Sequence, residues 1–190
     1  MRNKTTATPK MQISLRHITL TGLMTAVICI LSPFSLPIPL SPIPLTLGTL
    51  AIYFVISVLG MKLGTLSVLV YILLGLAGVP VFSGFRGGPS TVFGPTGGYI
   101  CGYIFLALIC GFFVDKWGDR IVLKFLGMVL GTAVLYLFGT IWLAWQASYT
   151  FPQALAAGVL PYIPLDTVKL IIGLIVGSQI RSRLLKAGLI

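Results

Sequence analysis

Six continuous runs of apolar residues make up most of this chain, separated by short stretches rich in polar residues, glycine or proline. A helix that crosses the roughly 30 Å hydrocarbon core of a bilayer needs about 20 apolar residues. The runs do not alternate apolar and polar positions, as the strands of a membrane barrel would. The pattern therefore predicts an all-α membrane protein with six transmembrane helices, at about residues 18–33, 45–60, 64–80, 98–114, 122–145 and 165–180.

The composition excludes a soluble globular protein. Hydrophobic residues make up 57% of the chain and charged residues only 8%, whereas about a quarter of a soluble domain is charged. We expect one compact helical domain over residues 1–190, with basic tails at 1–17 and 181–190.

The basic residues are distributed unevenly between the predicted loops. Cytoplasmic loops of membrane proteins carry an excess of Lys and Arg. Eleven of the 13 basic residues fall on one predicted side, so both termini are expected to be cytoplasmic and the net charge of +10 reflects topology rather than nucleic-acid binding. The two others are Arg86, on the opposite side, and Lys169, inside the last apolar run. The eleven are Arg2, Lys4, Lys10, Arg16, Lys62, Lys116, Arg120, Lys124, Arg181, Arg183 and Lys186.

Residues for catalysis are scarce. The chain has no glutamate, three aspartates and one histidine, His17. Asp115 and Asp119 lie in a loop, DKWGDR, that is expected to be solvated, which leaves Asp166 without a second acid for paired-carboxylate chemistry. The sequence has no G-x-x-x-x-G-K-[ST] motif for ATP, and its three cysteines have no metal-ligand or disulfide spacing. We expect no catalytic residue, no metal and no cofactor; the protein acts by binding.

The stretch PVFSGFRGGPSTVFGPTGGY, residues 80–99, carries six glycines on the predicted outer side. Glycine lets a chain turn back and lets a ligand approach the backbone, and irregular backbone at membrane depth is tolerated where it lines a cavity. Its apolar residues, such as Phe82 and Phe93, and the stiffening Pro89 and Pro95 favour a re-entrant wall of a binding site. The alternative is a flexible external loop.

Asp166 and Lys169 form a second polar group, in LPYIPLDTVKLIIG. Pro161 and Pro164 fix the start of the last helix and place Asp166 in its first turn. An aspartate there suits the helix dipole, but a lysine does not, and charged residues within a span are costly and usually functional. The pattern favours a ligand-binding role, with a simple ion pair as the alternative.

Small residues recur on the first helix at Gly22 and Ala26. This spacing lets another helix pack closely, either within the domain or from a partner. Trp142 and Trp145 are interpreted as anchors at the membrane interface.

Two motifs together resemble the BioY family, the biotin-binding S component of energy-coupling factor (ECF) transporters. They are the run GVPVFSGFRGGPSTVFGPTGGYICGY, above all its GPTGGY, and the DTVK at the start of the last helix. The resemblance covers nearly the whole chain. It implies biotin uptake across the bacterial cytoplasmic membrane, with biotin held near the outer face. It also implies that ATP is hydrolysed by two ATPase subunits, which act through a transmembrane coupling protein.

The resemblance also implies which residues bind. The family's helix-one surface for the coupling protein corresponds to Gly22 and Ala26, where glycine replaces a commoner alanine, and the segment SGFRGGPS is bulkier than the family pattern. The implied ligand-binding residues are Ser83, Gly84, Phe85, Arg86, Gly87, Gly88, Phe93, Gly94, Pro95, Thr96, Gly97, Gly98, Tyr99, Asp166 and Lys169.

Biotin suits these residue types. A carboxylate accepts from its ureido N–H groups, while an ammonium or a backbone amide donates to its ureido oxygen. Phe93 and Tyr99 could cover the apolar ring, and Arg86 either attracts the carboxylate tail or is a solvated loop charge.

A secondary transporter driven by an ion gradient remains the alternative, although such carriers usually keep several intramembrane acids or histidines. A purely structural membrane protein would not explain Lys169.

Overall fold

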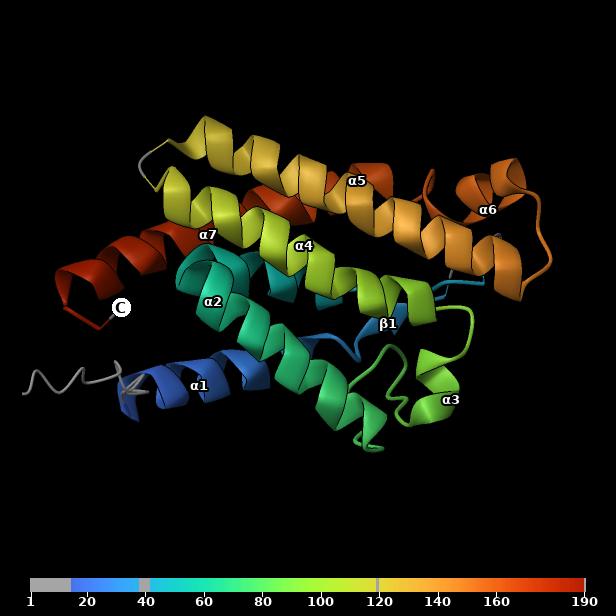
Figure 1. The fold of residues 1–190 in the computed structure, drawn as a ribbon, viewed down its shortest axis with the longest axis horizontal. Coiled ribbons are helices and arrows are strands. Elements are labelled where there is room, and N and C mark those ends of the chain that lie inside the picture. The colour runs from blue at the N-terminus through green and yellow to red at the C-terminus, as the bar shows by residue number, and fades with distance from the viewer. Residues whose placement is uncertain (1–14, 38–41, 119, 190) are drawn as a thin grey trace, which may run out of the picture.

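The computed structural model describes residues 15–37, 42–118 and 120–189. In this part of the chain, seven helices and one small antiparallel sheet form a single helical bundle (Figure 1). In the sheet, Ser35 pairs with Thr46 and Leu36 with Leu45. The elements are α1 (Leu15–Leu31), β1 (Ser35–Leu36), β2 (Leu45–Thr46), α2 (Gly48–Leu76), α3 (Pro89–Val92), α4 (Gly97–Lys116), α5 (Ile121–Gln146), α6 (Phe151–Gly158) and α7 (Ile163–Lys186).

Four of these helices, α2, α4, α5 and α7, are long and apolar enough to cross a membrane, and α1 is a shorter apolar helix. Their outward surfaces are apolar as well: Leu130, Ile141 and Val168 are each more than half exposed. Such surfaces suit lipid rather than water. The all-helical membrane class predicted from the sequence is confirmed, and the chain is a multi-pass membrane protein.

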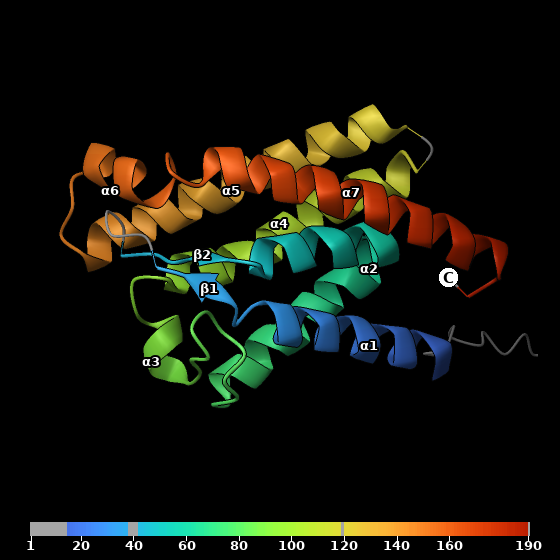
Figure 2. The same ribbon diagram turned by 180° about the vertical axis from the view of Figure 1, so that it is seen from behind.

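Helix α2 replaces the two separate helices predicted at 45–60 and 64–80. Its backbone leaves the helical region at Gly60, which has φ 76° and ψ −163°. The two arms on either side of Gly60 run in opposite directions and diverge from the turn (Figure 2). They pack closely next to the turn, where a Cβ on Gly64 would lie 3.3 Å from the Cα of Ile56. The predicted loop at 61–63 is therefore a one-residue reversal.

Two side chains from other helices satisfy the backbone at this reversal. The Asp115 carboxylate accepts a hydrogen bond from the Met61 N–H (2.9 Å), and the Arg181 guanidinium donates to the Val58 carbonyl (3.0 Å). Asp115 and Arg181 also pair with each other at 2.8 Å. Helix ends leave N–H and C=O groups without partners, so this pair caps both arms of α2. Asp115, predicted to be merely solvated, has a structural role.

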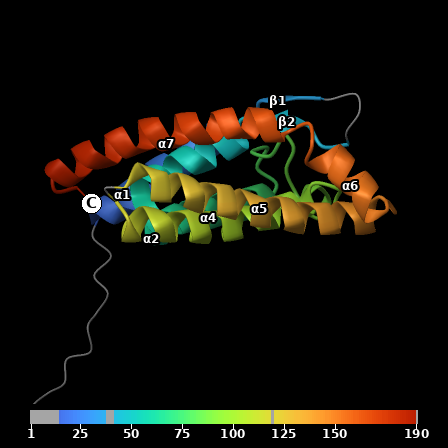
Figure 3. The same cartoon turned by 90° about the horizontal axis from the view of Figure 1, so that it is seen from above.

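The start of α1 and the end of α7 lie at the same end of the bundle. Arg16 donates to the Gly188 carbonyl at 3.1 Å there. The strands, α3 and α6 gather at the opposite end (Figures 2 and 3). In between, α4 packs against α5 and α2, and α2 against α7 and α1. The bundle thus has one end formed by helix ends and one covered by loops.

The structure revises several predicted boundaries. Helix α1 begins at Leu15 rather than 18, and α7 continues to Lys186, so Arg181 and Arg183 lie in a helix and not in a tail. The segment 146–164, taken as a loop, contains α6. Residues 1–14 of the basic N-terminal tail, residues 38–41 of the proline-rich segment SLPIPLSPIPL (35–45), and Asp119 lie outside the described residues.

Candidate functional site

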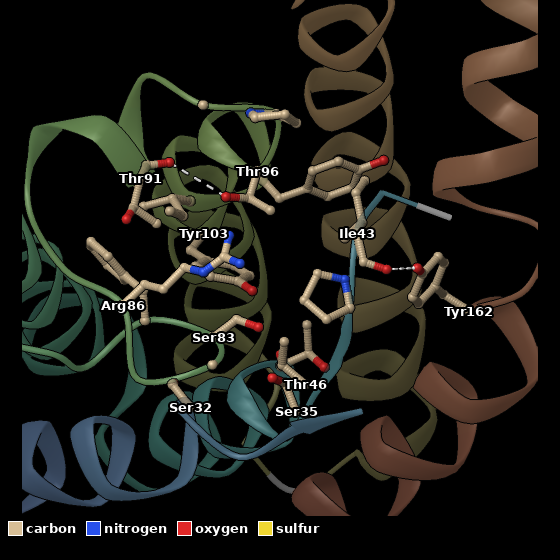
Figure 4. A pocket seen from close by; sticks show the side chains of 18 of the residues that line it. Ser32, Ser35, Ile43, Thr46, Ser83, Arg86, Thr91, Thr96, Tyr103 and Tyr162 are labelled. Carbon is tan, nitrogen blue, oxygen red and sulfur yellow. Dashed lines mark hydrogen bonds between the residues drawn. The ribbon is translucent and has the colours of Figure 1, made fainter. Parts of the chain in front are cut away.

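A cavity of about 680 Å³ opens at the loop-covered end of the bundle (Figure 4). Its volume is within the range of small-molecule sites, about 300–1,000 Å³. Its walls come from segments far apart in sequence: the segment after α1 with both strands, the 82–96 stretch, and the facing sides of α2, α4, α5 and α7. The glycine-rich loop and the last helix, between which the sequence predicted a binding site, both line this cavity.

Asp166 and Lys169 both line the cavity, and they pair with each other at 2.8 Å. Proline near the start of α7 places Asp166 in the first turn, as predicted, and Lys169 one turn further along. Both side chains are buried, with exposed fractions of 7% and 10%. The two interpretations made from sequence, an ion pair and a binding-site position, are therefore compatible.

The hydrogen bonds of this pair are nearly complete. Asp166 Oδ1 accepts from Lys169 Nζ and from the Thr49 hydroxyl (3.2 Å), and Oδ2 accepts from the Tyr136 hydroxyl (2.8 Å). Lys169 Nζ also donates to the Thr46 carbonyl at 2.7 Å and to Thr49 Oγ1 at 3.3 Å. An ammonium has three donors, and a carboxylate can accept about four hydrogen bonds. Lys169 is thus fully engaged, whereas Oδ2 of Asp166 can still accept one hydrogen bond from a ligand.

The glycine-rich loop brings seven of the predicted residues to the cavity. The Arg86 side chain extends into the cavity (Figure 4), and the Ser83 hydroxyl is buried with no hydrogen-bond partner among the described residues. The loop thus presents one cation and one free hydroxyl. The seven residues are Ser83, Gly84, Arg86, Gly94, Pro95, Thr96 and Tyr99.

Six predicted residues do not line the cavity. Phe85 and Phe93 point outward and are 61% and 64% exposed, so neither covers a ligand ring there. Gly88 has φ 88° and precedes α3. Gly87, Gly97 and Gly98 serve close packing instead: a Cβ on Gly97 would lie 1.8 Å from the Val92 carbonyl oxygen, and each of the other two would also meet a neighbour within 2.4 Å.

Trp142 supports the loop and is more than an interfacial anchor. Its indole Nε1 donates to the Gly94 carbonyl at 2.9 Å, and its side chain packs where a Cβ on Gly98 would be. The glycine at 98 therefore admits a large ring that ties α5 to the cavity wall. Trp145, three residues further along the helix, is 73% exposed and remains a candidate interface anchor.

Sequence reasoning missed most of the aromatic lining. Tyr103 follows Tyr99 by four residues on α4, a spacing that puts both on one helix face, and this was the available signal. Tyr162 lines the far wall and donates to the Ile43 carbonyl (Figure 4). The missed lining residues with polar side chains are Ser32, Ser35, Thr46, Thr49, Tyr71, Ser90, Thr91, Tyr103, Tyr136 and Tyr162.

The charges of the cavity favour an organic anion. Asp166 and Lys169 balance each other, so among the lining residues that the structure describes Arg86 leaves one uncompensated positive charge. Apolar and aromatic walls surround these groups. In the same described ranges, no three His, Cys, Asp or Glu side chains come together as metal ligands would. The site suits a partly apolar molecule with N–H donors and an acidic group.

The sequence of this chain is similar to those of a known protein family. Residues 2–186 match the model of the BioY family. "Biotin transporter BioY" of Thermotoga maritima is 32% identical over 168 residues, which cover 88% of this chain and 97% of that protein. "Probable biotin transporter BioY" of Pyrococcus horikoshii is 38% identical over 145 residues, 76% of this chain and 85% of that protein.

The fold is similar to a solved one. It matches the crystal structure at 2.1 Å of the S-component for biotin from an ECF-type ABC transporter with a TM-score of 0.82. The two chains are 31% identical, and the match covers 88% of this chain and 91% of the other.

Proposed function

This chain belongs to the BioY family, and from this membership we infer that it is a biotin transporter of the S-component type. The family consists of transport proteins, in agreement with the expectation that the chain is not an enzyme. The family resemblance read from GPTGGY and DTVK is thereby confirmed.

The observation that supports the proposed site is the presence of a buried acceptor and a separate cation in one cavity. Biotin has ureido N–H donors at one end and a carboxylate at the other. Asp166 Oδ2 accepts from a ureido N–H, and the Ser83 hydroxyl meets the ureido oxygen. Arg86 pairs with the carboxylate, and Tyr99 and Tyr103 border the apolar middle. Lys169, fully engaged, holds Asp166 and Thr49 in place and does not donate to the ligand.

In the membrane, the protein is proposed to cross six times, with both arms of α2 as separate crossings. The first arm has about 12 residues and is roughly 18 Å long at 1.5 Å per residue. It is short for a span, but protein rather than lipid surrounds it: Ala51, Ile52, Tyr53, Val55, Ile56 and Val58 are fully buried. The excess of basic residues at the opposite end from the cavity supports cytoplasmic termini and an outward-facing cavity.

We place the protein in the bacterial cytoplasmic membrane, with an ECF coupling protein and two ATPase subunits as partners. The surface for the coupling protein is on α1. Gly22 and Ala26 are both exposed, and a Cβ on Gly22 would meet nothing within 4 Å among the described residues. These residues are thus free of internal packing, the alternative left open by their spacing, and a partner helix can approach there.

Titration of the purified full-length protein with biotin, without ATP, tests the proposal. Saturable binding of biotin is expected, and saturation by another vitamin in its place would overturn the assignment. Uptake into vesicles with and without the coupling protein and ATPases separates ECF-type transport from the alternative of an ion-driven transporter. ATP-independent uptake by the chain alone would favour the alternative.

A further inference from the structure

The segment 82–86 forms a tight turn that carries Arg86. Phe82 N–H donates to the Arg86 carbonyl at 2.9 Å, and Arg86 N–H donates back to the Phe82 carbonyl at 3.3 Å. Between them, Gly84 has φ 71° and Phe85 has φ 56°. Positive φ is ordinary for glycine, but it is unfavourable for a bulky residue such as phenylalanine. Phe85 therefore occupies a conformation that its surroundings must hold.

The turn is fixed to the segment after α1 by two interactions. Gly84 N–H donates to the Pro33 carbonyl at 2.9 Å. The rings of Phe85 and Phe34 meet edge to face, with centroids 5.6 Å apart and an interplanar angle of 76°. Edge-to-face pairs at this separation are attractive beyond the area they bury. The Phe34–Phe85 pair is thus a specific interaction between two segments that are about 50 residues apart in the sequence.

The residues around this pair line the cavity, but the pair itself does not. Ser83, Gly84 and Arg86 line it on one side of the pair, and Ser35 lines it on the other. The rings of Phe34 and Phe85 lie outside, each more than half exposed. Because neither ring lines the cavity, the pair can influence a bound ligand only through neighbouring residues. The residue next to Phe85 is Arg86, whose cationic side chain projects into the cavity (Figure 4).

We propose that the Phe34–Phe85 pair positions Arg86 for the carboxylate of the ligand, so that Phe34 and Phe85 are positioning residues for the recognition of the acidic tail. This proposal rests on the proposed function. When either ring is removed, the turn loses one of its two attachments to the segment after α1, and Arg86 becomes mobile over the mouth of the cavity. Binding of the acidic end is weakened, while binding of the ureido end at Asp166 is retained.

The test compares biotin with its alcohol analogue, in which CH₂OH replaces the carboxylate, on the full-length protein in nanodiscs. For Phe34→Ala, biotin affinity should fall about three- to tenfold, the effect expected of an aromatic pair, while the affinity for the alcohol changes less than about twofold. Phe85→Asn keeps a residue that tolerates positive φ and should give the same pattern. Phe151→Ala, an exposed phenylalanine at the same end that does not line the cavity, is the matched control and should bind both ligands as the wild type does.

A second arm of the experiment uses Arg86→Met. This variant should lower biotin affinity to near that of the alcohol, and adding Phe34→Ala to it should weaken binding no further. Equal weakening of both ligands by Phe34→Ala, or additional weakening in the Arg86→Met background, would overturn the proposal, as would unchanged biotin affinity. Failure of the wild type to bind biotin at all would instead refute the proposed function.

Discussion

Replacing Lys169 by methionine keeps the length of the side chain and removes its ammonium group, which makes it the most informative perturbation of the cavity. In the structure, the change removes three hydrogen bonds at once, to Asp166 Oδ1, the Thr46 carbonyl and Thr49 Oγ1. It leaves Asp166 charged and 7% exposed at its side chain, with the hydrogen bonds from the Thr49 and Tyr136 hydroxyls in place of an ionic partner.

The magnitude follows from this geometry. Breaking a buried ion pair by removing one partner costs about 3–5 kcal/mol, so Lys169→Met should lower the unfolding free energy by that amount. Asp166→Asn keeps the shape but turns one acceptor into a donor, and an unmet buried polar group costs about 1–3 kcal/mol. The double variant leaves no unpaired charge at these two positions, so the two effects should fall short of additivity by about 1–3 kcal/mol.

Biotin affinity should respond differently from stability. Asp166→Asn places an amide where a ureido N–H must find an acceptor, and the double variant does the same, so both should bind at least about tenfold more weakly. Thermal unfolding and biotin titration on the same preparations measure both quantities. The expected result is a double variant that is destabilised by less than the sum of the two single variants, with a biotin affinity no higher than that of Asp166→Asn. Unchanged affinity in the folded fraction of Asp166→Asn would remove the pair from the binding site.

Three further predictions concern other parts of the molecule. Gly60→Ala should destabilise the protein by at least about 1–3 kcal/mol in thermal unfolding, because the φ and ψ of this residue are nearly restricted to glycine. The new Cβ would also lie 2.0 Å from Asp115 Oδ1. A melting temperature equal to that of the wild type would contradict a chain reversal at Gly60. Trp142→Phe removes the donor to the Gly94 carbonyl and should weaken biotin binding by about 1 kcal/mol, and unchanged binding would show that the loop holds its place without it. Ala26→Trp should abolish co-purification with the coupling protein while biotin titration stays normal, because the exposed face accepts bulk until a partner helix must pack on it. Normal co-purification would contradict the assignment of this face to the coupling protein.

The length of the apolar runs was enough to predict most of the bundle. Helices α4, α5 and α7 begin within two residues of their predicted starts, because an apolar segment in lipid must satisfy its backbone hydrogen bonds internally and therefore forms a helix. The C-terminal extension of α7 could not be seen this way, because a helix continues past its apolar run until a residue such as Gly188, at φ 64°, ends it. Helix α6 left a different signal in the sequence, a capping box between Thr150 and Gln153, and this signal was overlooked.

Some residues of the candidate site could likewise be predicted from the sequence, and others could not. Asp166 and Lys169 stood out because charge is rare in a span, and the structure brings both to the cavity. The tyrosines did not stand out, since an aromatic residue in an apolar run is equally compatible with core, lipid and site. The outward direction of Phe85 was unpredictable because it depends on a positive φ and on Phe34, which belongs to a distant segment. Local pattern carries no information on such long-range interactions.

The buried first arm of α2 has a consequence for how the protein enters the membrane during synthesis. At roughly 18 Å it is shorter than the hydrocarbon core that it is proposed to cross, so it is poorly suited to lodge in the bilayer by itself as it leaves the ribosome. The reversal at Gly60 joins it directly to the longer second arm, and the two are expected to insert together as a helical hairpin. The later helices α4 and α7, which pack against α2, then replace the lipid around it, so the arm reaches its final surroundings only when the last helix of the chain has been made.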